Sequence, residues 1–214
     1  MKNILKFLWI SLFVLFSCNK ETIVDTPEQV GISKVTYYVV LTLNGAAFQS
    51  VVMGTPYVDS GATAVENGKT TTYTTSGSVD INTEGIYTLT YTAVNQDGYP
   101  SSITRNVAVI PSAPLPGVDL SGTYANVGSA PLTANISMVA PGVYFTSNCW
   151  GGASSAVIPA YFFSSDGATI TLPTQKFSAY GNLKGTGTYV GGLITWDITL
   201  IDLATERIKS WQKQ

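Results

Sequence analysis

Apolar and polar residues alternate along most of this chain, and this period of two predicts β-strands. The clearest run is 86–94, in which tyrosine, leucine and alanine alternate with three threonines. Successive side chains of a strand point to opposite faces, so one face of this run should lie on a core and the other in water. A similar alternation over 35–43, ended by Asn44-Gly45, predicts another strand and a turn.

The second half of the chain holds eight short apolar runs, separated by turn signals such as Pro141-Gly142 and Gly191-Gly192. No stretch after the first 17 residues has helical spacing, so we expect an all-β protein. Strands this short and evenly spaced indicate an antiparallel meander, either closed into a small barrel, which we favour, or folded into a sandwich. The expected strands are 122–127, 132–140, 143–147, 156–163, 168–172, 183–190, 193–201 and 205–211.

Prolines 111, 114 and 116 mark a domain boundary, because proline cannot join the hydrogen bonds of a sheet and favours a stiff, extended chain. We therefore expect one β-domain over 34–110, a linker over 111–117 and a second β-domain over 118–214. Residues 18–33 are polar and without period, which predicts a flexible stalk.

The first 17 residues have the pattern of a secretory signal: Lys2 and Lys6, an apolar stretch, then Leu15-Phe16-Ser17-Cys18. Cysteine at that position predicts a bacterial lipoprotein, cleaved before Cys18 and tethered to a membrane by acyl chains on its sulfur. The alternative is a helix that stays in the membrane. The apolar stretch 4–16 is shorter than the roughly 20 residues that a spanning helix needs.

Composition removes several classes of function. The chain has no histidine, which excludes Ser-His-Asp and Cys-His nucleophile pairs and histidine-ligated zinc. Its 11 basic and 13 acidic residues form no clustered basic surface, so we expect no nucleic-acid partner. We also expect no cofactor and no metal.

Cys149 has no partner if Cys18 carries lipid, and no Lys or Arg lies near it in sequence to lower the pKa of its thiol. A buried, inert thiol is the favoured reading. The alternative is a Cys18–Cys149 disulfide, which would tie the N-terminus to a distant domain.

Several spaced motifs of the first domain follow in the order of a known family. They are Val51 to Ala64 with Gly54, Asp59 and Gly61, then Ser76 to Asp80, Gly85 to Ala93, Asp97-Gly98 and Arg105 to Val109. Over residues 35–110 the chain resembles the immunoglobulin-like (Ig-like) domain of pesticidal crystal proteins and many bacterial surface proteins. The resemblance implies a β-sandwich. Where relatives often carry an acidic run, this chain has Glu66-Asn67-Gly68-Lys69, so we expect no calcium site there.

The second domain resembles the uncharacterised C-terminal domain of Bacteroidetes surface lipoproteins. The motifs that carry this resemblance are Leu120 to Tyr124, Cys149 to Gly152, Pro159 to Phe163, Tyr180-Gly181 and Gly185 to Tyr189. Members of that group often accompany polysaccharide-uptake systems. Cys18-Asn19-Lys20-Glu21 also resembles the signal that directs some of these lipoproteins to the outer face. The resemblance implies an outer-membrane protein, lipid-anchored and facing the cell exterior.

Trp150 is the best candidate for a ligand contact, because an aromatic ring flanked by glycines in a loop is suited to stacking on a sugar. Tyr161, Phe163 and Tyr180 are expected to extend the same patch. The alternative is that Trp150 plugs one end of the barrel while Tyr161 or Phe163 fills its core. Two further tryptophans are expected in the core, Trp196 on an apolar face and Trp211 at the barrel base.

Carboxylates are sparse, and Asp197 with Glu206 is the one pair that adjacent strands could bring together for hydrolysis. Both fit solvated strand positions equally well, so we predict that the protein is not an enzyme. The expected function is non-catalytic recognition of an extracellular glycan or protein, with glycan recognition in a polysaccharide-uptake system as the more specific hypothesis. The alternative is a structural or protein-binding subunit of an outer-membrane complex, without a small-molecule site.

Overall fold

The computed structural model describes residues 29–30, 33–128, 132–151, 156–177 and 179–214. The predicted signal peptide, Cys18 and most of the stalk lie outside these residues. Residues up to Tyr37 form one unit, which holds a small hairpin of β1 (Gln29–Val30) and β2 (Ser33–Lys34), and Tyr38–Gln214 form a second. In the described residues of both, strands dominate and the helical element is one 3-10 turn, η1 (Ile201–Leu203). The predicted all-β class is confirmed.

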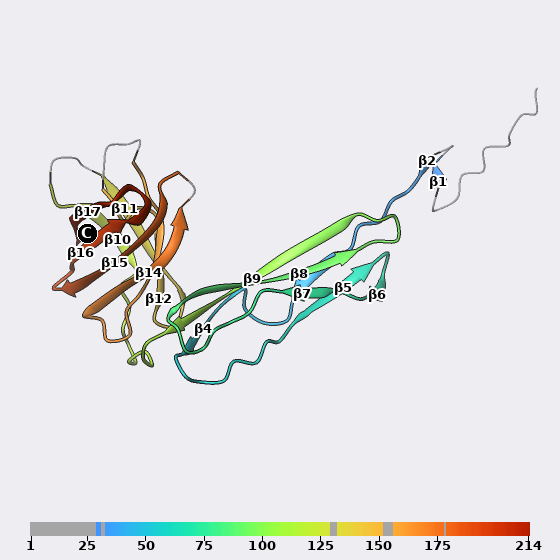
Figure 1. Ribbon diagram of the computed structural model, residues 1–214, viewed down its shortest axis with the longest axis horizontal. Coiled ribbons are helices and arrows are strands. Elements are labelled where there is room, and N and C mark those ends of the chain that lie inside the picture. Colours follow the sequence, from blue (N-terminus) through green and yellow to red (C-terminus); the bar gives the residue numbers. More distant parts are fainter. Residues whose placement is uncertain (1–28, 31–32, 129–131, 152–155, 178) are drawn as a thin grey trace, which may run out of the picture. The chain divides into compact units, whose positions relative to one another are not determined.

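Two sheets build the first domain (Figure 1). One orders β3 (Val40–Leu43), β5 (Ala62–Glu66) and β6 (Lys69–Thr71). The other orders β4 (Phe48–Val52), β9 (Pro100–Ile110), β8 (Gly85–Val94) and β7 (Thr74–Ser76), with β4 and β9 parallel.

The strand predicted over 86–94 is β8, and its Leu89, Tyr91 and Ala93 are buried as expected. The strand predicted over 35–43 is wrong in its first half, because β3 begins only at Val40. The partner strand β5 ends at Glu66, one residue beyond Val65, which pairs with Val40, so pairing with β5 cannot extend over residues 35–38.

Arg105 lies fully buried inside this sandwich and is surrounded by oxygen acceptors. It donates to the backbone carbonyls of Asn44 (2.7 Å) and Gly61 (3.2 Å) and forms an ion pair with Asp59. The Tyr91 hydroxyl also donates to Asp59, at 2.7 Å. A buried guanidinium is tolerated only when its charge and its N–H groups are satisfied, and here both conditions are met.

The second domain is a closed eight-stranded antiparallel barrel with strands in chain order (Figure 1). All eight strands expected in this half are present, and they form the favoured barrel and not a sandwich. They are β10 (Gly122–Asn126), β11 (Thr133–Ala140), β12 (Val143–Thr146), β13 (Ala160–Phe163), β14 (Thr169–Phe177), β15 (Gly181–Val190), β16 (Leu193–Leu200) and β17 (Thr205–Lys213).

β14 runs five residues further than predicted and passes through Pro173. The pairing register with β15 shifts between Leu172 and Gln175, so the proline, which has no N–H to donate, sits in the irregular stretch.

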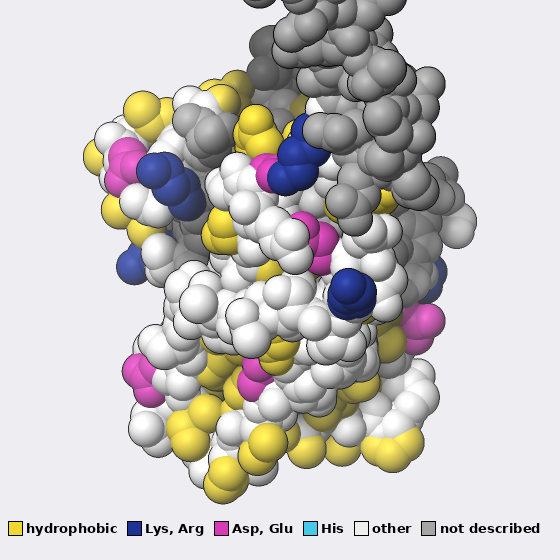
Figure 2. Space-filling view, turned by 90° about the vertical axis from the view of Figure 1, so that its right-hand side faces the viewer, with side chains coloured by type: hydrophobic (Ala, Val, Ile, Leu, Met, Phe, Trp, Pro, Cys, Tyr) yellow, Lys and Arg dark blue, Asp and Glu magenta, His cyan; other side chains and the backbone are white. Residues whose placement is uncertain are grey.

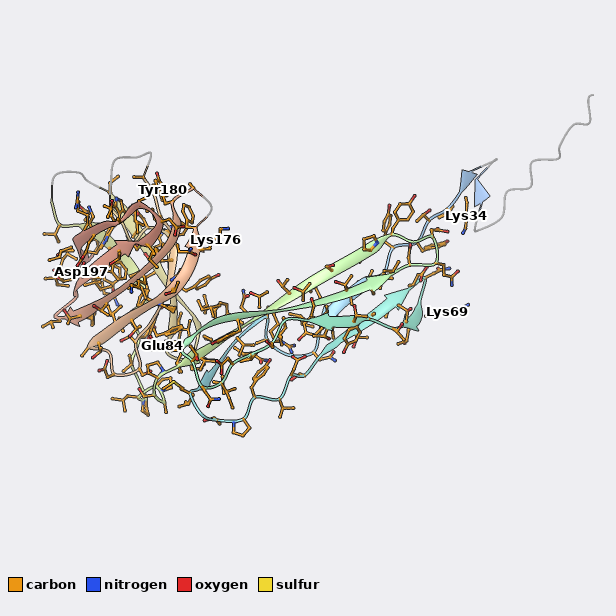
Figure 3. The ribbon with its side chains drawn as sticks, in the orientation of Figure 1. Lys34, Lys69, Glu84, Lys176, Tyr180 and Asp197 are labelled. Carbon is orange, nitrogen blue, oxygen red and sulfur yellow. The ribbon has the colours of Figure 1, made fainter. Side chains whose placement is uncertain are left out.

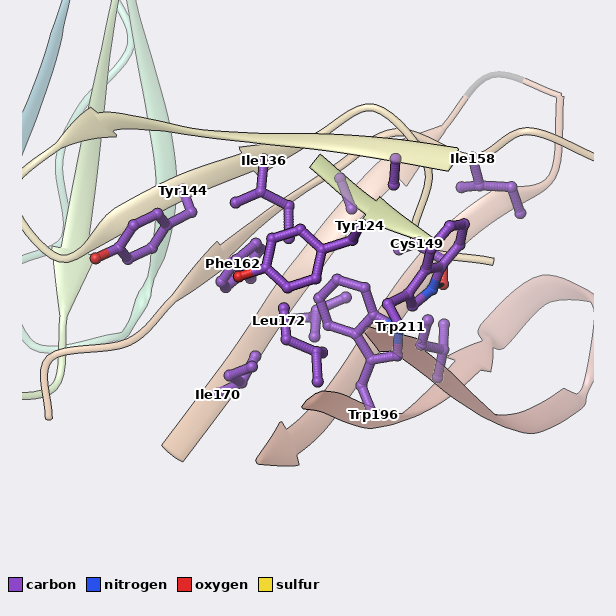
Figure 4. Close-up of a cluster of buried hydrophobic side chains, with 14 of the residues drawn as sticks. Tyr124, Ile136, Tyr144, Cys149, Ile158, Phe162, Ile170, Leu172, Trp196 and Trp211 are labelled. Carbon is purple, nitrogen blue, oxygen red and sulfur yellow. Dashed lines mark hydrogen bonds between the residues drawn. The ribbon is translucent and has the colours of Figure 1, made fainter. Parts of the chain in front are cut away.

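Large aromatic side chains fill the barrel (Figure 4). Trp196 is 1% exposed and Trp211 is fully buried, as the sequence predicted. Gly187 on the neighbouring strand lets the chain pack closely against Trp196, because a Cβ on Gly187 would lie 2.8 Å from the Cβ of Trp196. The Trp196 ring meets the edge of Phe162 at 5.4 Å between centroids, a favourable aromatic geometry.

An apolar cluster joins the two domains, and we call it the junction cluster. Its buried members are Ala108 and Ile110 of β9 with Ala140, Val143 and Phe163 of the barrel, and Phe48, Val52, Ile86 and Val139 pack around them. The Ser50 hydroxyl adds a hydrogen bond to the Pro141 carbonyl at 2.8 Å. The domains therefore meet through side-chain packing as well as through the linker.

The proline-rich linker is itself attached to the barrel. The Leu115 N–H donates to the Ser165 carbonyl, and the Ser165 hydroxyl donates to the Ser112 carbonyl, both at 2.8 Å. These bonds attach the linker to the barrel at Ser112 and Leu115, so stiffness here comes from hydrogen bonding as well as from proline.

Candidate functional site

Trp150 lies in the connection between β12 and β13, which is packed into one end of the barrel. The Asn148 side-chain oxygen accepts backbone N–H groups from Trp150 and Gly151, both at 3.1 Å, and from Ile158 at 3.3 Å. The Trp211 indole N–H donates to the Cys149 carbonyl at 3.2 Å. Asn148, Cys149 and Ile158 are buried, so this segment closes the barrel end.

The Trp150 ring is half-buried against the barrel core. The Lys209 ammonium lies 4.9 Å from the ring centroid, a cation–π contact. One face of the indole is therefore already occupied by a cation. This geometry favours the alternative in which Trp150 plugs the barrel, and not the bare stacking platform.

Tyr180 lies in the β14–β15 connection, at the same end of the barrel as Trp150. Its ring stacks on Phe177, with centroids 6.0 Å apart and planes 10° from parallel. Figure 3 shows Tyr180 beside the end of β14, away from Glu84. Of the four predicted aromatics, these two share one region.

Tyr161 and Phe163 lie elsewhere, and their expected place beside Trp150 is wrong. Phe163 is 1% exposed in the junction cluster, and the Tyr161 ring contacts Phe48 of the first domain at 5.1 Å. Neither fills the barrel core, because the strand alternation points Phe162 inward and its two neighbours outward.

A groove on the outer surface of the barrel is lined mainly by polar side chains. It crosses β14 to β17 and has a volume of about 360 Å³. The strand register sets its lining, because Thr171, Thr186 and Asp197 lie in one row and Lys184, Thr199 and Glu206 in the next. Thr174 and, from the first domain, Glu84 complete the polar lining.

The charged groups of this groove, Glu84, Lys184, Asp197 and Glu206, are unpaired. None of their side chains forms an ion pair or a hydrogen bond with any residue that the structure describes. Asp197 Oδ1 is buried and accepts nothing among the described residues. Arg105 and Asp59, by contrast, satisfy each other inside the sandwich. The groove thus presents polar groups that a ligand could pair.

Asp197 and Glu206 do come together, as the sequence allowed. They project from the same face of β16 and β17, since Glu206 pairs with Thr199 and Asp197 with Ile208. A glycosidase places its two carboxylates on opposite sides of the bond that it cleaves. Two carboxylates side by side on one wall do not have that geometry.

Cys149 is the free cysteine among the described residues and is fully buried. Burial raises the pKa of its thiol to about 12, so the thiol stays protonated at neutral pH. Burial of Cys149 therefore keeps its thiol unreactive, as expected from the sequence.

Over the described ranges, no three Cys, Asp or Glu side chains lie close enough together to hold a metal ion. In the same residues, no helix is both long and apolar enough to cross a membrane. The face in Figure 2 carries single charges of both signs among uncharged side chains, without a continuous basic strip.

Sequence reasoning missed the groove because it depends on four strands and on a residue from the other domain. A partial signal was present in the runs 183–190 and 193–201, whose outward positions are threonine, lysine and aspartate. That pattern was interpreted only as a solvated face.

Comparison with known proteins supports the prediction that the first domain is Ig-like. Residues 41–109 match the family model of the Ig-like domain of bacterial surface proteins. A solved lipoprotein of Bacteroides thetaiotaomicron aligns with 83% of this chain and 100% of its own, at 26% identity and a TM-score of 0.43. A search of curated proteins gave no match. The first domain is therefore an Ig-like domain of the bacterial surface type.

Proposed function

We propose that this protein is a lipid-anchored surface protein that binds an extracellular glycan without catalysing a reaction. The contact surface in this proposal is the groove over β14 to β17. The observation that carries it is the set of unpaired charged side chains lining a concave surface with four threonines. Sugars offer many hydroxyl groups, which donate to carboxylates and accept from ammonium and threonine groups.

The anchor in this proposal is Cys18. Replacing Cys18 by alanine removes the sulfur that would carry lipid, so we expect the protein to move from the membrane fraction to the soluble exported fraction. Cell fractionation with immunoblotting measures this. Unchanged membrane association would contradict the lipid anchor.

A glycan array probed with the exported Cys18→Ala chain tests the binding role. In the glycan proposal, Asp197→Asn and Thr199→Val weaken the array signal because they remove groups from the groove. The matched control is Lys69→Ala, a change at an exposed position on the first domain. Equal signals from the groove variants and the control would refute the groove as contact surface.

A protein-binding role is the second candidate, and an exposed residue beside the groove favours it. Ile208 is 70% exposed and shares a shallow depression with Asp197 and Glu206. If Ile208→Ser abolished capture of an outer-membrane protein while no glycan bound, this second role would replace the first.

A further inference from the structure

The groove contains one acidic group from the first domain. Of its described lining residues, Glu84 alone belongs to the Ig-like domain, and the others come from the barrel. Figure 3 places Glu84 where the first domain meets the barrel. The Ig-like domain therefore contributes to the site and is more than a spacer.

Local hydrogen bonds and the junction cluster fix the position of Glu84. It follows a turn in which the Asn82 N–H donates to the Asp80 carboxylate at 3.0 Å. The Tyr87 hydroxyl donates to the Thr83 carbonyl at 2.8 Å. Two residues after Glu84, Ile86 packs against the junction cluster. The backbone at Glu84 is thus held beside the barrel by contacts on both sides.

The groove has an excess of negative charge. Three carboxylates, from Glu84, Asp197 and Glu206, line it with one ammonium, from Lys184. None of these groups is neutralised by an ion pair within the described residues. A concave surface focuses such a field and raises the local concentration of cations while it repels anions.

The buried carboxylate oxygen of Asp197 gives a further reason to expect a positively charged hydrogen-bond donor on the ligand. Its Oδ1 is buried and lacks a hydrogen bond from any described residue, so this carboxylate is incompletely solvated. A carboxylate in that state gains more from an ammonium donor than from a neutral hydroxyl, because charge-assisted hydrogen bonds are the stronger ones.

Resting on the glycan-binding role above, we propose that the groove selects saccharides that carry free amino groups over acidic saccharides. The two domains build the selectivity jointly, with Glu84 supplied by the Ig-like domain and Asp197 and Glu206 by the barrel. Neutral sugars of the same length bind with intermediate affinity, and uronic-acid oligomers bind weakest.

The test uses the full exported chain with Cys18→Ala and three oligosaccharides of equal length. These are oligomers of glucosamine, of N-acetylglucosamine and of galacturonic acid. Calorimetric titration at a pH of about 6 keeps side-chain carboxylates ionised. We expect affinity to fall in that order and the preference for glucosamine to shrink with added salt, because salt screens exposed charges.

Charge-neutral variants assign the effect to residues. Glu84→Gln and Asp197→Asn should each reduce the preference for glucosamine over N-acetylglucosamine about two- to fivefold, the range of partly exposed charge pairs. Glu66→Gln, on the first domain and outside the groove, is the matched control and should change nothing. Thermal unfolding confirms that each variant is folded.

The outcomes separate this inference from the role on which it rests. If the oligomers bind but galacturonate binds as well as glucosamine, or Glu84→Gln and Asp197→Asn leave the preference unchanged, the charge selectivity is wrong and glycan binding stands. If none of the three oligomers binds, both are overturned.

Discussion

The two domains have cores of different chemistry. The Ig-like sandwich places a charged network of Arg105, Asp59 and Tyr91 among small apolar residues. The barrel fills its interior with aromatic rings, among them Trp196 and Trp211, that pack by shape. A charged network depends on every partner being present, whereas an aromatic core depends on filled volume. The domains should therefore fail under different perturbations.

The largest effect is expected at the charged network. Arg105→Ala leaves the Asp59 carboxylate without its cation and removes the guanidinium donors to the carbonyls of Asn44, Ala46 and Gly61, so it should destabilise the Ig-like domain by about 3–5 kcal/mol. Urea unfolding measures this. Trp196→Ala should cost a similar ~3–5 kcal/mol, but in the barrel. A loss under about 1 kcal/mol for Arg105→Ala would show that the network contributes little.

The next effect concerns the contact between the domains. Phe163→Ala leaves a cavity in the junction cluster and should cost about 3 kcal/mol, the lower end for a buried phenylalanine. It should also separate one unfolding transition into two, because the shared packing is lost. Differential scanning calorimetry measures both, and Phe145→Ala, at a half-buried position on the neighbouring strand, is the comparison. An unchanged transition would mean that the linker alone couples the domains.

Acid should weaken the sandwich through Asp59. Burial raises the pKa of this carboxyl, but hydrogen bonds from Tyr91 and the Gly61 N–H and the ion pair with Arg105 outweigh burial and leave the pKa below its usual value. A depressed pKa stabilises the fold above the unfolded value of about 4, and this stabilisation disappears as pH falls through the folded value.

Asp59→Asn should therefore flatten the loss of stability below a pH of about 4. Urea titrations across the acid range measure this, with Asp166→Asn as the comparison. Asp166 is an exposed barrel residue whose pKa is lowered by N–H groups of Ala168 and Thr169, and solvent screens its contribution. If Asp59→Asn and Asp166→Asn reduced the loss of stability in acid equally, the network around Arg105 would have no special role in the acid sensitivity of the protein.

The smallest expected effect is at Trp150. Its ring is half-buried and covered by Lys209, so Trp150→Ala should cost about 2 kcal/mol, less than a fully buried tryptophan. It should leave glycan binding at the groove unchanged. Thermal unfolding and calorimetric titration measure the two. Weaker glycan binding at unchanged stability would restore Trp150 as a stacking platform.

The fold was predictable wherever one face of a strand is apolar. Trp196 and the eight barrel strands follow directly from the alternation. The roles of Tyr161 and Phe163 were not predictable in this way, because the run 161–163 is aromatic throughout and shows no preferred face. A shift of one residue exchanges every inward and outward side chain of a strand, and the pairing with β12 and β14 fixes the register.

The alternation of apolar and polar residues could not predict the charged network or the groove, for a different reason. Arg105 appeared in the sequence only as part of a family motif, and its acceptors come from segments about 45 to 60 residues away. Glu84 and Asp197 lie in different domains. Contacts of this kind depend on how distant segments meet, which alternation along a single strand does not encode.

Gly142 makes the boundary between the domains sensitive to a single methyl group. A side chain at this position would lie 2.8 Å from Pro114 of the linker and 3.4 Å from Ile110 of β9, in a backbone conformation with φ near +72°. Any larger residue at position 142 would push against the linker and β9, and so would disturb the packing that joins the two domains.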